Sequence, residues 1–131
     1  MIATKRVYEP YEASDGYRVL VDRLWPRGIS KERAHIDRWA KEISPSNDLR
    51  QWYEHDPVKW PEFRRRYREE LRAPEAKAAL DDLVRQARKG RVTLVYGSHA
   101  GNISNAAALR LILTRRIGRE KQGSRGGARR P

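Results

Sequence analysis

Two nearly continuous apolar runs constrain the fold of this chain more than any other feature. One is Val19–Val21 within "YRVLVD", and the other is "RVTLVYG" at positions 91–97. Strands that are apolar throughout are covered on both faces, which is typical of a parallel sheet. About 65 residues of mainly helical pattern separate the two runs. The sequence therefore predicts a small α/β fold, with a largely parallel sheet flanked by helices and a long helical insert between the second and last strands.

Shorter patterns place the other elements around these two strands. Residues 3–9, "ATKRVYE", form a short β-prone segment ahead of them. Ser30 is a candidate N-cap, and Asp56-Pro57 resembles a helix start. One further helix is expected before the last strand and another after it, capped by Asn102 or Ser104. A helical face is also expected where apolar residues recur at i, i+3, i+4 and i+7, at Ile36, Trp39, Ala40 and Ile43.

The charge of the chain is unevenly distributed. The 131 residues carry a net charge of +12, and the segment 115–131 holds seven Lys or Arg and one Glu, or +6. We expect a single α/β domain over residues 1–117 and a basic, disordered tail over 118–131, because this tail is rich in glycine and poor in apolar residues. The tail is either a solubilising extension or a non-specific phosphate-binding arm.

Composition excludes several classes of protein. No apolar run is long enough to span a membrane, and the N-terminus lacks the apolar stretch of a signal peptide, so we expect a cytoplasmic protein without a membrane partner. There are no cysteines, so disulfides and thiolate chemistry are excluded. The three histidines, His35, His55 and His99, are isolated in the sequence. We therefore expect no metal and no cofactor.

Ligands of open α/β sheets bind outside the carboxyl ends of the strands, which directs attention to two loops. The loop "DRLWPRG" follows the first apolar run, and "GSHAGN" follows the second. Their arginines suit a phosphate or carboxylate, an indole can stack on a flat ligand, and glycines allow close backbone approach. The candidate ligand-binding residues are Asp22, Arg23, Trp25, Arg27, Gly97, Ser98, His99 and Asn102.

Each candidate also has a purely structural interpretation. Asp22 can pair with a neighbouring arginine, and Trp25 can simply cover the core. His55 and Asp56 are weaker candidates, because "HDP" is also a common way to begin a helix. No G-x-S-x-G or phosphate-loop motif surrounds Ser98, so the residues alone assign no catalytic group and leave open whether the protein is an enzyme.

Three segments resemble a known family. "DGYRVLVDRLWPRGISKERA", "LRQWYEHDPVKWPEFRRRYREEL" and "GRVTLVYG" are similar to the YeaO-like group of the domain-of-unknown-function family 488, over about Lys5 to Leu113. The resemblance implies a small cytoplasmic α/β protein of bacteria and no established reaction. Members of this group usually carry an acidic loop and a His-Asn pair after the last strand. Here Ala100, Gly101 and Asn102 replace the acids, and Ile103-Ser104 replaces the pair, so any activity of that loop is expected to be altered.

Three functional hypotheses follow from the sequence. The favoured one is a protein that binds a small anionic ligand, phosphate or nucleotide-like, at the loops 22–28 and 97–102. The second is a nucleic-acid-associated protein that uses the basic tail for non-specific contacts. The third is a protein-interaction module with an exposed aromatic patch, since the chain has four Trp and six Tyr. The oligomeric state is left open.

Overall fold

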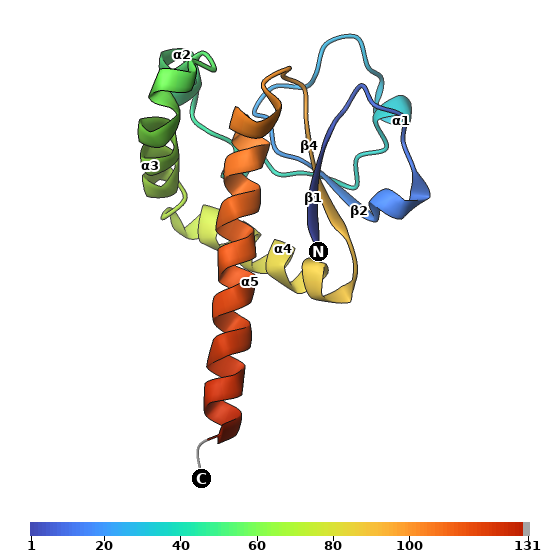
Figure 1. Ribbon diagram of the computed structural model, residues 1–131. Coiled ribbons are helices and arrows are strands. Elements are labelled where there is room, and N and C mark those ends of the chain that lie inside the picture. Colours follow the sequence, from blue (N-terminus) through green and yellow to red (C-terminus); the bar gives the residue numbers. More distant parts are fainter. Residues whose placement is uncertain (130–131) are drawn as a thin grey trace.

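A computed structural model describes residues 1–129 and shows a four-stranded, entirely parallel sheet (Figure 1). The strands are β1 (Ile2–Arg6), β2 (Tyr17–Leu20), β3 (Arg38–Trp39) and β4 (Val92–Tyr96), in the spatial order β1-β4-β2-β3. β4 lies between β1 and β2, and its five residues are all buried. The α/β class, the parallel sheet and the helical segment between β2 and β4 confirm the fold expected from the sequence.

The two faces of the sheet are covered differently. Val92, Leu94 and Tyr96 of β4 belong to the main hydrophobic core, whereas Val95 packs with Val7 on the other face in a second, smaller cluster. This alternation is the period of two that a β-strand imposes on its side chains. The last strand is therefore almost entirely apolar because both of its faces are covered, as its sequence indicated.

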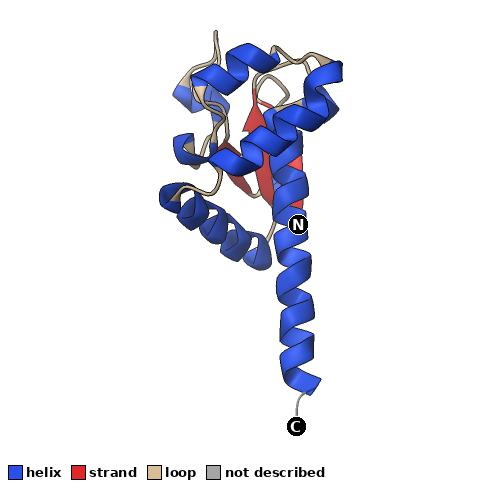
Figure 2. Ribbon diagram, turned by 90° about the vertical axis from the view of Figure 1, so that its left-hand side faces the viewer, coloured by secondary structure: helices blue, strands red, loops and turns tan. Residues whose placement is uncertain are grey.

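Helices cover the main core, as Figures 1 and 2 show. α4 and α5 contact β4 directly, and α5 also contacts β1. Serine side chains cap three of the helices, with Ser30, Ser46 and Ser104 accepting backbone N–H bonds at 3.1 to 3.2 Å. The helices are α1 (Lys31–Ala34), α2 (Asn47–Tyr53), α3 (Trp60–Glu70), α4 (Pro74–Lys89) and α5 (Asn105–Arg129), with short 3-10 turns at Ala13–Asp15, Lys41–Ile43, Pro57–Lys59 and Gly101–Ile103.

The helical face expected over residues 36–43 is wrong. α1 ends at His35, which has a left-handed φ of 50°, and the chain then forms β3 alongside β2. The backbone N–H of Ala40 donates to Leu20 and thereby extends the pairing beyond the strand. Ile36 packs against the smaller cluster, whereas Ala40 and Ile43 belong to the main core. The apolar residues therefore serve two different faces of the sheet, and their helical spacing is coincidental.

The last helix runs through most of the segment in which the sequence favoured disorder. α5 extends to Arg129, and side chains are described up to Arg119. The division of the chain at residue 117 stays a prediction, because residues 130 and 131 and the side chains from residue 120 lie outside the description. None of the helices in the described part combines the length and the hydropathy of a membrane-spanning segment.

A buried ion pair holds the smaller face together. Arg18 is only 1% exposed, and its guanidinium donates to Asp15 at 2.6 Å and to the carbonyls of Ala34 and His35 at 2.9 and 3.1 Å. Lys5 adds a second cation at 3.1 Å from the same carboxylate. Burial alone raises the pKa of Asp15, but the hydrogen bonds that it accepts outweigh burial and hold that pKa below its ordinary value.

We expect Asp15→Ala to lower the free energy of unfolding by about 3–5 kcal/mol, because it leaves Arg18 charged and unpaired inside the protein. Urea denaturation at pH 7 measures this loss. Glu12→Ala is the matched control: Glu12 bonds the same lysine from a side chain that is 65% exposed, so its loss should cost about 1 kcal/mol or less. Equal effects of the two substitutions would contradict a structural role for the buried pair.

Candidate functional site

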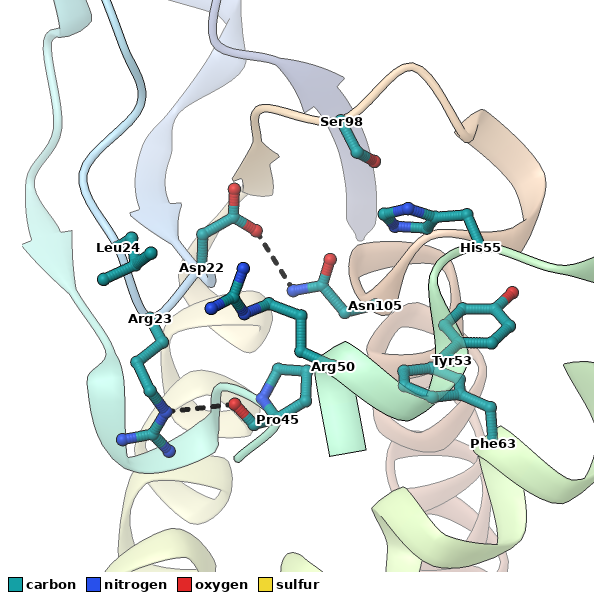
Figure 3. A pocket seen from close by; sticks show the side chains of 10 residues that line it. All are labelled: Asp22, Arg23, Leu24, Pro45, Arg50, Tyr53, His55, Phe63, Ser98 and Asn105. Atoms are coloured by element: carbon teal, nitrogen blue, oxygen red, sulfur yellow. Dashed lines mark hydrogen bonds between the residues drawn. The ribbon is translucent and has the colours of Figure 1, made fainter. Parts of the chain in front are cut away.

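A cavity of about 170 Å³ lies where β2 and β4 end and α5 begins (Figure 3). The loop after β2 forms one wall of the cavity, and the loop after β4 forms a second wall together with the start of α5. A third wall is formed by α2 and the turn that follows it. This is the position at which open α/β sheets bind ligands. Its lining residues are Asp22, Arg23, Leu24, Pro45, Arg50, Tyr53, His55, Phe63, Ser98 and Asn105.

Asp22 joins the two loops that the sequence singled out. Its carboxylate accepts the backbone N–H of Gly97 at 2.8 Å and the side-chain amide of Asn105 at 3.2 Å. A Cβ on residue 97 would lie 3.4 Å from the Asp22 carboxylate, an ordinary van der Waals distance, so the contact between the loops does not depend on the glycine. Burial raises the pKa of Asp22, and the two hydrogen bonds and the charges of His55 and Arg50 only partly oppose that rise.

Asn105 is a site residue that the sequence reasoning missed. It is the first residue of α5 and is buried, and its amide also donates to the carbonyl of Val21 at 2.7 Å. Ser104 in front of it caps the helix, and this cap fixes the point at which α5 starts. The "SN" of the loop sequence signalled a cap, but nothing in the sequence showed that the asparagine reaches back to β2.

Arg23 has a structural task at the wall of the cavity. Its guanidinium donates to the carbonyls of Pro45 and Ser44 at 3.0 and 3.1 Å. Figure 3 shows this group directed toward the segment before α2 and away from Asp22. Arg23 therefore fixes the position of α2 relative to the sheet.

Arg50 and His55 bring nitrogen donors to the opening of the cavity. Arg50 lies on α2, and Figure 3 shows its guanidinium on the same side as Asp22 and Asn105. His55 has a left-handed φ of 55°, and its ring faces Ser98. Burial lowers the pKa of His55, and the negative charge of Asp22 partly opposes that effect. Arg50 was not among the predicted residues, because a single arginine on a short helix gives no distinguishing signal.

An aromatic pair forms the apolar wall. Tyr53 and Phe63 stack with their ring centroids 4.0 Å apart, and the Tyr53 hydroxyl donates to the carbonyl of Ile103 at 2.7 Å. Burial, together with the charge of Asp56, raises the pKa of Tyr53 to about 12, so the hydroxyl stays protonated as a donor at neutral pH. The tyrosine thereby ties the end of α2 to the loop before α5.

Several predicted residues lie outside the cavity lining. Trp25 donates its indole N–H to Ile29 at 2.7 Å and packs against the smaller core cluster. Arg27 and His99 are exposed, and Asp56 caps the turn before α3. Asn102 lines a different surface depression near β1 and α5. Of the two loops, then, the cavity contains Asp22, Arg23 and Ser98, with Gly97 bonded to its edge.

The donor set of the cavity is unlike that of a metal centre. Among the described residues no three His, Cys, Asp or Glu side chains are grouped so as to hold a metal ion. Ser98 is also poorly placed as a nucleophile, because among these residues no hydrogen bond joins it to His55 or Asp22. Its hydroxyl instead accepts the backbone N–H of Ala100 at 3.4 Å. What the cavity offers is one carboxylate, cationic donors and an aromatic wall.

The fold and the strand-end cavity place this chain among small α/β proteins, and comparison with known proteins defines the group. A family model described as "Inactive DUF488-N3 subclade" matches residues 1–129, and the chain belongs to the DUF488 family. It is 44% identical to the uncharacterised protein YeaO of Escherichia coli K12 over 109 residues, which cover 82% of this chain and 92% of YeaO. This likeness confirms the resemblance to the YeaO-like group.

Relatives also occur in mycobacteria. The uncharacterised protein Rv3073c of Mycobacterium tuberculosis H37Rv is 41% identical over 115 residues, which cover 88% of this chain and 95% of that protein. The uncharacterised protein Mb3100c of Mycobacterium bovis matches to the same extent. No solved structure matches the chain.

The pH dependence of stability tests the placement of Asp22. A raised pKa in the folded state means that the protonated carboxyl favours folding, and this contribution is lost as the pH rises through the folded-state pKa. Asp22→Asn cannot titrate. We therefore expect the free energy of unfolding of the unmodified protein to rise relative to that of the variant as the pH falls from 7 to 3.5.

Urea denaturation of both proteins at several pH values measures this difference. The titration of Asp15 is common to both and cancels in the comparison. A difference that stays constant across the pH range would show that the environment of Asp22 does not favour its protonated form.

Proposed function

We propose that this is a small cytoplasmic protein that binds, without turning over, a small ligand carrying one anionic group in the strand-end cavity. The observation that carries the proposal is the convergence of Arg50 and His55 on a cavity at the carboxyl edge of a parallel sheet. Phosphate, sulfate and carboxylate groups all suit a planar guanidinium, and the ring N–H of a neutral imidazole can donate a further hydrogen bond to them. The cavity is smaller than those that enclose drug-sized ligands, so only the anionic end of a nucleotide would enter it.

The charges that line the cavity constrain how a ligand binds. Asp22 repels negative charge, so the anionic group of the ligand contacts the guanidinium of Arg50, which lies on the same side of the cavity. A hydroxyl or amine of the ligand faces Asp22, and its apolar part packs on the Tyr53–Phe63 wall. This revises the hypothesis drawn from the loops alone, because the binding arginine becomes Arg50 in place of Arg23 and Arg27.

Two observations favour binding over catalysis. The matching family model carries the description "inactive". In addition, positions at which the YeaO-like group usually has a His-Asn pair serve structural purposes here: the carbonyl of Ile103 accepts the Tyr53 hydroxyl, and Ser104 caps α5. We infer that the loop 98–104 of this chain shapes the cavity and contributes no reacting group.

The aromatic-patch hypothesis gains no support from the aromatic residues Trp52, Tyr53 and Trp60 of α2 and α3. Tyr53 is only 2% exposed, and Trp52 and Trp60 pack against the main core. These rings build the domain and do not form an open patch for a partner.

Sulfate is a suitable probe, because its charge does not change between pH 5 and 7. We expect sulfate to shift the amide resonances of Gly97, Ser98 and Asn105 in a ¹⁵N-labelled sample. The substitution Arg50→Gln should weaken sulfate binding about ten- to a hundredfold, because it removes a charged hydrogen bond. Affinity should rise as the pH falls, because the raised pKa of Asp22 lets this carboxylate lose its negative charge earlier than an ordinary aspartate does.

Arg27→Gln is the matched control, since it removes the same charge from an exposed position outside the cavity. Its affinity should stay within about twofold of the unmodified protein. Equal losses from the two variants, or loop amides that do not respond to sulfate, would overturn the proposal.

A further inference from the structure

A second, independent feature is a groove lined by arginines between α3 and α5. Its volume is about 230 Å³, and its floor is apolar, formed by Ala108, Leu111 and Ile112 of α5. A neighbouring depression of about 220 Å³ shares Arg68, Ile112, Arg116 and Arg119 with it and continues toward α4. The cationic residues along the two are Arg64, Arg68, Arg72, Lys77, Arg115, Arg116 and Arg119.

Among the residues whose side chains are described, few carboxylates oppose this charge. Asp81 bonds Arg116 at 2.7 Å, and Glu69 lies 3.4 Å from Arg72. Neither carboxylate lines the groove or its continuation. The potential in the groove is therefore strongly positive, and an apolar floor beneath the charges strengthens their interaction with a bound anion.

Two guanidinium groups in the groove are held in place and yet incompletely bonded. Among the described residues, Arg64 Nε and Arg116 Nη1 are buried without a hydrogen-bond partner. Arg64 is positioned by stacking over Trp60, with 5.3 Å to the ring centroid, and Arg116 by its bond to Asp81. A buried N–H group without an acceptor is costly, so both nitrogens favour an anion that supplies the missing acceptor.

The spacing of the arginines identifies the chemistry of that anion. Arg64 and Arg68 of α3 are four residues apart, and so are Arg115 and Arg119 on the facing helix α5, while Arg72 follows in the turn after α3. Side chains four residues apart on a helix lie on one face, about one turn from each other. The groove therefore presents rows of planar donors that repeat along its length.

We propose that this groove binds the phosphate backbone of a nucleic acid. A nucleic-acid strand carries one phosphate per nucleotide, so its charges repeat as the arginines do, and guanidinium groups bind phosphates in a bidentate manner. An acidic peptide would need carboxylates placed at matching intervals by its sequence. No aromatic side chain lines the groove itself, so the contacts are to the backbone and independent of base sequence.

The experiment compares charge in the groove with the same charge elsewhere. The full-length chain carrying Arg64→Gln, Arg68→Gln and Arg115→Gln keeps every charge of the segment 118–131. Its control carries Arg27→Gln, Lys31→Gln and Arg33→Gln, which remove three exposed charges near α1, away from the groove (Figure 1). Binding of fluorescein-labelled single-stranded and duplex DNA is followed by fluorescence anisotropy at salt concentrations between about 50 and 300 mM.

We expect the groove variant to bind DNA at least about tenfold more weakly than the control and to reduce the salt slope by about two to three, at 0.7–0.9 per lost phosphate contact. Because Arg64 is half-buried, the pair Arg68→Gln and Arg115→Gln, both exposed, is measured alongside in case the triple variant loses its fold. Its control is the pair Arg27→Gln and Arg33→Gln.

Equal losses in the groove variant and its control would show that only net charge matters and would overturn the proposal. So would tight binding of an acidic Glu-repeat peptide that the groove substitutions abolish while DNA binding is unchanged. These results do not test the proposal that the strand-end cavity binds an anion, because the variants leave Arg50 and the amides around Ser98 unchanged.

Discussion

The Asp22 carboxylate holds together the part of the molecule on which the candidate site depends. One of its oxygens accepts the Gly97 N–H and the other accepts the Asn105 amide, so the ends of β2 and β4 and the start of α5 meet at a single side chain. Asn105 reinforces this junction through its bond to Val21. Parallel pairing of β2 with β4 brings the two loops to the same edge, and Asp22 fixes how far apart they stand.

The two carboxylates that matter most are stabilised by different partners and so respond to pH in opposite directions. Asp15 has two cations against it, Arg18 and Lys5, and its pKa is lowered. Asp22 has only neutral donors in direct contact, and its pKa is raised. A carboxylate paired with cations stabilises the fold at neutral pH, whereas a buried carboxylate held only by neutral donors has no cation to compensate its negative charge, and its pKa rises. This contrast favours Asp22 over Asp15 as a group that serves a ligand.

The fold was predictable from the sequence to the extent that it depends on periodicity and local caps. Unbroken apolar runs identified β2 and β4, and hydroxyl or carboxylate side chains identified the starts of α1, α5 and the turn at Pro57. β3 was not predicted, because a strand of two residues is too short to show an alternating pattern. It forms because the edge of β2 is free to pair with it. The positions of Arg50, Tyr53 and Asn105 in the cavity were not predicted for a related reason. They reach the cavity through packing between elements that are distant in the sequence.

The positive charge of the chain acts differently in its two cationic regions. In the cavity, Arg50 and His55 share their surroundings with Asp22, so a ligand must match both signs, and selectivity depends on geometry. In the groove the arginines have few opposing carboxylates, so attraction depends on the number of anionic groups and weakens with salt. α5 takes part in both, because Asn105 at its start bonds Asp22 and its later turns carry Arg115, Arg116 and Arg119. A single helix thus connects a small, charge-balanced cavity with an extended cationic surface.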